Sequence, residues 1–566
     1  MVDQFHQENQ AYGSITNLLS LPIELIQNVA CMAAEGDRRH LRLVCKHLGH
    51  ILESQVLHTI YVKFHNEGPS LKRNISMIRL LATAPASTPF SRSTRCLVLG
   101  SLSPRLNYLL WVYRTKMLRD DSYNPPALSI AEDGMMASAE DKIRKYLFKA
   151  IVSLSNLQSV RWTTAKSDEA WCQTIVIDAL NSLPAFRDLT IDMDYLQVDL
   201  PLSLLQNLSR ISISTPSSAE VNSASLHNFA QAIALSSPGQ ITNVELVRQH
   251  YYSSPTTADP SASLHHYLRF CADQGSFLQL RHLRIKNLSF RLDEITSPHL
   301  IHLTSLDLSN IQEPALENSF GSTVSEIWIE LARLKIHLEE ISVSAIPISF
   351  LDYLKHYPGL KLLALKVPAF NSREQSEQYA SLFFRDGTLD QHVETLEDLT
   401  IDASFEDYWC FGEHNISSIS SCRRLKHLSM AISTEDLRVP AAAQQSGSVW
   451  DDALGVLIST VASHLPDLAH LSITPAHPER FRSSYLSGNS VSNHFVFARE
   501  KLVEHLEAYH APTPLFKLPI VTIDDRGDPK AFEPELECRD DFSFWRYPIP
   551  SENHGLDWIR ETRIGA

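Results

Sequence analysis

The sequence predicts an α/β protein in which a small helical module precedes a long array of strand and helix units. Three observations lead to this prediction. A short apolar pattern returns twelve times from residue 94 onward, amphipathic helices stand before several copies of it, and a proline often separates the helix from the pattern. The helices and the prolines are the stronger evidence, because abundant aliphatic residues produce so short a pattern by chance.

The helical module is predicted over residues 18–62, after a polar and flexible N-terminus of residues 1–17. Pro22 stands where a helix tolerates proline, in its first turn or just before it. The apolar residues that follow recur at three- and four-residue steps, as expected for one face of a short helix. They are Leu25, Ile26, Val29 and Met32.

A second helix is expected after Gly36 and Asp37, which provide a stop and a new cap. Its apolar stripe runs from Leu41 to Leu52, and Leu57 with Ile60 indicates a third short element. Three short helices enclose little core by themselves. We therefore expect a partner surface to complete the burial.

This helical module resembles an F-box. The family's L-P-x-E-L run, charged hinge and L-x-x-V-C-K run are similar to residues 21–25 and 41–46, whereas Leu48 and His58 stand where the family often has Trp. The resemblance implies docking to the Skp-type adaptor of a cullin-RING ubiquitin ligase. The residues that it implies for this contact, or for the packing beneath it, are Leu21, Pro22, Leu25, Ile26, Val29, Leu41 and Val44. The alternative is an ordinary helical hairpin that caps a larger domain.

The array is predicted over residues 90–480, where each copy of the pattern reads apolar, two residues, apolar, one residue, apolar. The copies begin at residues 94, 157, 186, 208, 241, 280, 303, 338, 360, 396, 425 and 468. Helices are expected over residues 168–183 and 451–465. The prolines that precede copies of the pattern are Pro184, Pro238, Pro358 and Pro466. The unit is thus a helix, a turn and a short strand.

Alternation within the strands predicts their environment. Leu189 and Ile191 point to one side and Asp188 and Thr190 to the other, so half of each strand is solvated. Strands joined through helices run parallel, and right-handed crossovers place the helices outside a curved inner sheet.

This array is similar to a leucine-rich-repeat solenoid in an irregular form. Asp, Ser, Lys or Thr stands where the usual Asn would follow the third apolar position, which predicts uneven, helix-rich repeats. A helical module of this kind followed by such an array resembles the F-box/leucine-rich-repeat receptors common in fungi.

The polar strand positions are the candidates for substrate binding. The basic strand at residues 282–286 is a possible docking point for an acidic or phosphorylated segment, and positions 398 and 402 are acidic. The candidates are Arg210, His282, Arg284, Lys286, Asp398 and Asp402. The alternative for each is a merely solvated position on the sheet.

Four polar stretches are expected to be exposed insertions between the units, and the chain is expected to close with a C-terminal cap and tail over residues 481–566. The insertions are residues 119–142, 214–225, 253–263 and 440–449. Aromatic residues at 542–547 either close the array or form a separate binding patch.

Composition limits the classes of function and the cellular compartments that fit the sequence. A net charge of -15 disfavours nucleic-acid binding, and no apolar stretch is long enough for a membrane span. Eight widely spaced cysteines indicate free thiols in a reducing compartment, the cytoplasm or the nucleus. The nearest approach to a metal cluster, Cys410 with His414 and Cys422, is expected to be coincidental. We assign no catalytic residue, metal or cofactor.

The resemblance therefore implies the substrate-recognition subunit of a Skp-cullin-F-box ligase, which binds an unidentified protein substrate and has no catalysis of its own. The alternative is a non-catalytic scaffold, or an adaptor-bound interaction protein, without a ubiquitination role. A third hypothesis, a hidden hydrolase, requires titratable side chains gathered in one cleft.

Overall fold

The computed structural model describes residues 19, 21–64, 68–84, 88–104, 130–165, 168–193, 200–205, 207–215, 230–234, 240–248, 264–311, 322–367, 370–434, 453–482, 489–512, 518–523, 530–539 and 542–548. The predicted flexible N-terminus and most of the predicted insertions lie outside these residues. The chain divides into two compact units. The first comprises residues 1–163, 167–186 and 557–566, and the second comprises residues 164–166 and 187–556.

The helical module forms four helices where three were predicted. They are α1 Ile23–Met32, α2 Glu35–Val44, α3 Lys46–Ile51 and α4 Glu53–Val56. The predicted second helix is split because Cys45 is extended, and its Sγ atom accepts the Leu48 N–H at 3.5 Å to cap α3. The predicted stop at Gly36 is also wrong, since Ala33 already ends α1 and Gly36 lies inside α2.

The described residues of the first unit also form three parallel strands and four further helices. These are β1 Thr59–Val62, α5 Gly68–Thr83, α6 Pro89–Ser93, β2 Cys96–Leu99, α8 Ile130–Val152, β3 Ser159–Thr164 and α9 Ala170–Asn181. The sheet begins at β1, within the residues assigned to the helical module, because Leu57, Ile60 and Val62 repeat the apolar pattern of the array. Helix α8 also corrects the insertion at 119–142, since Met136 and Ala139 are buried in the core.

In the described residues of the second unit, ten parallel strands follow one another in chain order, and each strand from β5 onward pairs with the one before it. They are β4 Asp188–Met193, β5 Arg210–Thr215, β6 Asn243–Arg248, β7 His282–Lys286, β8 Ser305–Ser309, β9 Glu340–Val343, β10 Leu362–Lys366, β11 Asp398–Asp402, β12 His427–Ile432 and β13 His470–Pro475. Each begins at the third residue of a predicted copy of the pattern, as β2 and β3 do. The predicted α/β class with a large parallel sheet is confirmed.

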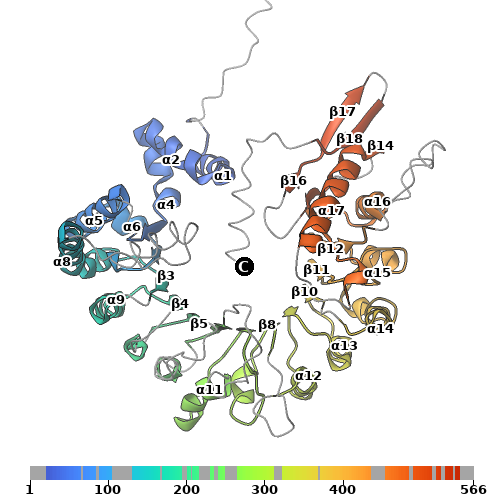
Figure 1. Ribbon diagram of the computed structural model, residues 1–566, viewed down its shortest axis with the longest axis horizontal. Helices are drawn as coiled ribbons and strands as arrows, with labels where there is room; N and C mark the ends of the chain where they lie inside the picture. The colour runs from blue at the N-terminus through green and yellow to red at the C-terminus, as the bar shows by residue number, and fades with distance from the viewer. Residues whose placement is uncertain are drawn as a thin grey trace, which may run out of the picture. The chain divides into compact units, whose positions relative to one another are not determined.

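Helices and short 3-10 turns connect these strands, and α11 to α16 lie along one side of them (Figure 1). The helices are α11 Leu264–Asp273, α12 Val324–Arg333, α13 Ile348–Lys355, α14 Arg373–Phe384, α15 Ile416–Ser421 and α16 Ala453–His464. The 3-10 turns are η3 Leu202–Leu204, η5 Ser297–Leu300, η6 Leu389–His392 and η8 Glu479–Phe481. Alternate strand residues such as Leu399 and Ile401 are fully buried against the helices.

The C-terminal part extends the sheet beyond the predicted end at residue 480. Helix α17 Asn489–Ala508 is followed by β15 Ile520–Ile523, which pairs in parallel with β13 and repeats the apolar pattern at Leu518. Strand β16 Lys530–Phe532 then pairs antiparallel with β15. The large sheet therefore ends at β16, later in the chain than predicted.

A separate antiparallel sheet contains β14 His510–Pro512, β17 Glu535–Arg539 and β18 Phe542–Arg546. Just after β18, the Tyr547 side chain is buried and its hydroxyl donates to the Pro519 carbonyl at 3.0 Å. For Tyr547, this burial favours a role in closing the array over a role in a separate binding patch. No helix within the described ranges is both long and apolar enough to cross a membrane.

Candidate functional site

The helical module has a small core of its own. Helix α1 contributes Ile26 and Ala30, and helix α3 contributes Leu48 and Ile51, with Leu52 beside them. Three of the predicted adaptor-binding residues, Leu21, Ile26 and Leu41, belong to this core or pack on its edge. These three residues therefore contribute to the packing of the module.

The other predicted adaptor-binding residues are exposed. Pro22 is exposed and starts α1, where its carbonyl accepts the N–H groups of Leu25 and Ile26 at 3.0 and 3.1 Å. Leu25, Val29 and Val44 are 48%, 50% and 70% exposed. Exposed aliphatic side chains of this size are candidates for contact with a protein partner.

Three further exposed apolar side chains extend this set and were missed as adaptor-binding candidates. Ile23 is 50% exposed, Leu43 is 78% exposed and Met32 is 90% exposed. Helical periodicity is the signal that separates them, because Leu43 and Val44 fall between the core positions Leu41 and Leu48. We call Ile23, Leu25, Val29, Met32, Leu43 and Val44 the exposed apolar set.

Two glutamines, also missed from the sequence, fix α1 on the later helices. The Gln27 side chain donates to the Ile51 carbonyl at 3.3 Å, and the Gln55 side chain donates to the Gln27 carbonyl at 3.1 Å. Gln55 also contacts the Cys31 sulfur at 3.2 Å. These bonds fix α1, which presents four members of the exposed apolar set, on α3 and α4.

The second candidate surface is the polar face of β4 to β13, which carries the first, third and fifth residue of each strand. The parallel register aligns the third residues, so that Glu245 of β6, Arg284 of β7 and Asp307 of β8 are neighbours. Arg284 Nη1 lies 2.9 Å from Glu245 Oε1, and Arg284 Nε lies 3.0 Å from Asp307 Oδ2.

These ion pairs change the interpretation of the basic strand. Arg210 also reaches the same carboxylate, with Nη2 3.8 Å from Glu245 Oε2. The carboxylates of Glu245 and Asp307, on the two flanking strands, offset the charge of Arg284. At the two ends of β7, His282 is exposed and Lys286 is partly exposed. The central cation of the predicted basic strand is therefore paired with carboxylates on both neighbouring strands, and its role in docking stays a prediction.

Over β11 to β13 the polar face has a different character. Asp398 Oδ2 lies 3.7 Å from His427 Nδ1, and the rings of His427 and His470 stack with centroids 5.2 Å apart. Burial raises the pKa of Asp398 while His427 opposes this shift, and burial lowers the pKa of His470.

Small hydroxyl side chains occupy the next row of this region, where Thr400, Ser429 and Ser472 are aligned by the register. Asp402 is exposed at the far end of β11, in register with Lys366 of β10. This part of the polar face thus combines short side chains with titratable ones, whereas the part over β5 to β8 is bridged by long charged side chains.

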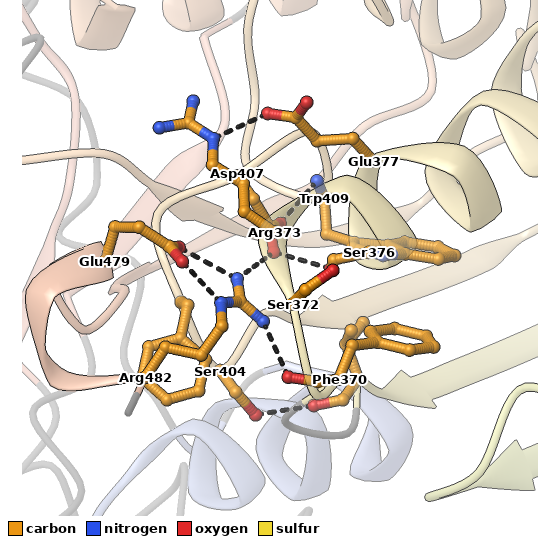
Figure 2. A network of polar contacts seen from close by, with 12 residues as sticks. Phe370, Ser372, Arg373, Ser376, Glu377, Ser404, Asp407, Trp409, Glu479 and Arg482 are labelled. Atoms are coloured by element: carbon orange, nitrogen blue, oxygen red, sulfur yellow. Dashed lines mark hydrogen bonds and ion pairs between the residues drawn. The ribbon is translucent and has the colours of Figure 1, made fainter. Parts of the chain in front are cut away.

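A buried ionic network lies where β10, β11 and β13 lead into their loops. Figure 2 shows the Arg482 guanidinium between the carboxylates of Glu479 and Asp407, with the Phe370 carbonyl beside it. Arg482 Nη2 lies 2.8 Å from Asp407 Oδ2, and Arg482 Nη1 donates to the Phe370 carbonyl at 3.2 Å. The side chains of Arg482 and Asp407 are only 6% and 3% exposed.

Further contacts make this network a structural joint between loops. Asp407 also accepts the Ser376 hydroxyl at 2.6 Å and the Trp409 N–H at 3.0 Å. The Arg482 guanidinium lies over the Phe405 ring at 4.5 Å. Every polar atom named here has a partner within the fold, so the network holds three loops together. Its members are separated in sequence by up to about a hundred residues, which is why no local pattern indicates it.

Cys410, His414 and Cys422 have separate structural roles. His414 Nε2 lies 2.7 Å from the Tyr408 carbonyl, and Cys422 donates to the Ser418 carbonyl. Burial raises the pKa of Cys422 to about 12, which disfavours the thiolate. Within the part of the chain that the structure describes, no three His, Cys, Asp or Glu side chains are arranged to hold a metal ion.

No family model matches the chain, and no curated protein is significantly similar to it.

Proposed function

We propose that this protein is the substrate-recognition subunit of a Skp-cullin-F-box ubiquitin ligase, acting in the cytoplasm or the nucleus. The observation that carries the proposal is the exposed apolar set on α1 and α2. Four of its six residues lie in the two runs that resemble the F-box, and exposed aliphatic side chains on short helices are typical of positions that a protein partner covers. The Skp-type adaptor is the proposed partner.

The core beneath this surface supports the same proposal. Leu21, Ile26 and Leu41 pack within the helical module, so the F-box-like runs supply both a scaffold and a contact surface. In this proposal the module docks the adaptor without needing a large core of its own.

The strand and helix array is proposed to be an irregular, curved leucine-rich-repeat solenoid that holds the protein substrate. Its polar face is the proposed substrate-binding surface, with the short side chains over β11 to β13 leaving more room than the charged bridge over β5 to β8. The protein would act by raising the effective concentration of substrate near the ubiquitin-charged enzyme.

The adaptor contact is tested by binding of the purified full chain to a purified Skp-type adaptor. Leu25→Lys with Val44→Lys places two charges on the exposed apolar set, and affinity should fall by about tenfold or more. Leu80→Lys is the matched control, since Leu80 is 56% exposed on α5 outside the helical module. Equal affinity of the double variant and the control would overturn the adaptor proposal.

A non-catalytic scaffold without a ubiquitination role is the alternative, and a second experiment separates the two. Cullin and ubiquitinated proteins should co-purify with the wild-type chain and its adaptor, and both should be lost in the double variant. If the adaptor is retained without cullin, the scaffold is the better description. Deletion of the helices α1 to α4 should leave unmodified substrates bound to the array, where they can be identified by mass spectrometry.

A further inference from the structure

Three buried polar side chains connect consecutive strand segments of the second unit in the same way. In each case, a backbone N–H that leads into one strand is bound by a side chain from the segment leading into the next strand. His299 Nδ1 accepts the Leu278 N–H at 2.9 Å, Tyr353 Oη accepts the Leu338 N–H at 3.3 Å, and His392 Nδ1 accepts the Leu360 N–H at 3.4 Å.

The two histidines occupy equivalent places. Each stands six residues before the first residue of a strand, 299 before 305 of β8 and 392 before 398 of β11. Each lies in a 3-10 turn, η5 or η6, and each is fully buried. His356 holds the same place before β10, but it follows the longer helix α13 and is exposed.

The hydrogen bonds define the protonation state of both rings. A nitrogen that accepts an N–H carries no hydrogen, so Nδ1 is the acceptor and the proton of the neutral ring is on Nε2. In His392 this Nε2 lies 3.1 Å from the Leu354 carbonyl and donates to it. In His299 the buried Nε2 has no hydrogen-bond partner within the described residues.

Among the described residues, no charged side chain contributes to the pKa shift of either ring. Phe277 packs on His299 at 5.4 Å between ring centroids, and Tyr357, itself titratable, packs on His392 at 5.5 Å. Burial lowers the pKa of each histidine to about 4, with only the Leu354 carbonyl opposing the shift at His392. A second ring proton would point at the leucine N–H and would place a charge in an apolar site.

We propose that His299 and His392 form acid-sensitive joints, at which protonation of the ring releases the preceding strand segment and opens the array locally. The joints connect β7 to β8 and β10 to β11, so opening would change the spacing of polar-face residues that include Arg284 and Asp307. Tyr353 forms the corresponding joint between β9 and β10. Burial raises the pKa of its hydroxyl, which therefore stays neutral in acid and at neutral pH. This proposal does not depend on a ubiquitin-ligase function.

Hydrogen exchange of the full chain at pH 7.5 and pH 5.0 tests the joints, with each amide corrected for its intrinsic rate. A ring that opens to an ordinary pKa near 6.5 is protonated at pH 5.0, so the protection of Leu278 and Leu360 should fall by about 30-fold. The protection of Leu338, bound by Tyr353, should change much less. Equal losses of protection at Leu338 and Leu360 would overturn the proposal.

Two variants sharpen the test. His392→Gln keeps an acceptor and a donor without a titration, so the pH dependence at Leu360 should disappear while that at Leu278 remains. His356→Gln is the matched control and should leave both unchanged. If His392→Gln does not fold, His299→Gln gives the reciprocal test, and the comparison of Leu338 with Leu360 in the wild-type chain still decides the proposal.

Discussion

The helical module and the strand array use similar aliphatic residues with opposite results. In the array, Leu399 and Ile401 have no exposed surface, whereas Leu43 and Val44 of the module are mostly exposed. Each array strand is flanked by two others and is covered by helices on one side. Four short helices cover little beyond their own five-residue core. Neighbours, rather than hydrophobicity, decide which leucines stabilise the fold and which are left for a partner.

The largest effect should come from the buried ionic network of the array. Arg482→Ala leaves the Asp407 carboxylate buried without its cation, which should lower the free energy of unfolding by about 3–5 kcal/mol. Urea unfolding measures this change. Arg333→Ala is the control, because Arg333 pairs with Glu330 at the surface and its removal should alter stability far less. Similar effects of the two substitutions would show that the network is not buried as described.

A single buried leucine of the array should have the next largest effect. Leu399→Ala removes a fully buried side chain from β11 and should cost about 3 kcal/mol in the same unfolding measurement. A cost below about 1 kcal/mol would mean that the array tolerates cavities and would weaken the contrast with the module.

Acidification should destabilise the array through its two buried histidines. His299 and His392 have pKa values near 4 in the fold, whereas an unfolded histidine titrates near 6.5. Their contribution to stability is complete above pH 6.5 and is lost as the pH falls towards 4, because the unfolded chain then binds more protons.

At pH 5 the expected loss is about 2 kcal/mol for each of these histidines. Unfolding of the wild type and of His392→Gln at pH 7.5 and pH 5.0 isolates the share of one histidine. If both proteins lose stability equally between these pH values, His392 does not contribute as expected.

The smallest effect on stability should come from the exposed apolar set. Leu43→Ser should change the free energy of unfolding by less than about 0.5 kcal/mol, because the side chain is already mostly exposed. It should nevertheless weaken adaptor binding, measured by calorimetry or by co-purification. A large loss of stability would place Leu43 in the core and would remove the distinction between the two regions.

Local patterns predicted the strands well and their ends less well. In all twelve predicted copies of the pattern a strand begins at the third residue, because alternation along a strand is a property of adjacent residues. The strands β1 and β15 carry the same pattern but were assigned to the module and to the tail. The break between α2 and α3 depends on an extended Cys45, which neighbouring helix formers conceal.

The candidate sites were predicted only in part. The helical runs located the exposed apolar set, but periodicity was needed to separate Leu43 and Val44 from the core residue Leu41. For the polar face, the sequence listed Arg284 as a candidate without its partners. Glu245 is 39 residues away along the chain, and only the strand register brings the two side chains within 2.9 Å.

The sequence by itself determined where the strands begin, which side of each strand is apolar, and where helices and turns separate them, because these depend on local spacing and backbone preference. The tertiary structure alone decided which aliphatic side chains stay exposed, which charges are neutralised, and how His299 and His392 connect successive segments. Burial and charge pairing depend on residues distant in sequence, and packing is what brings those residues together.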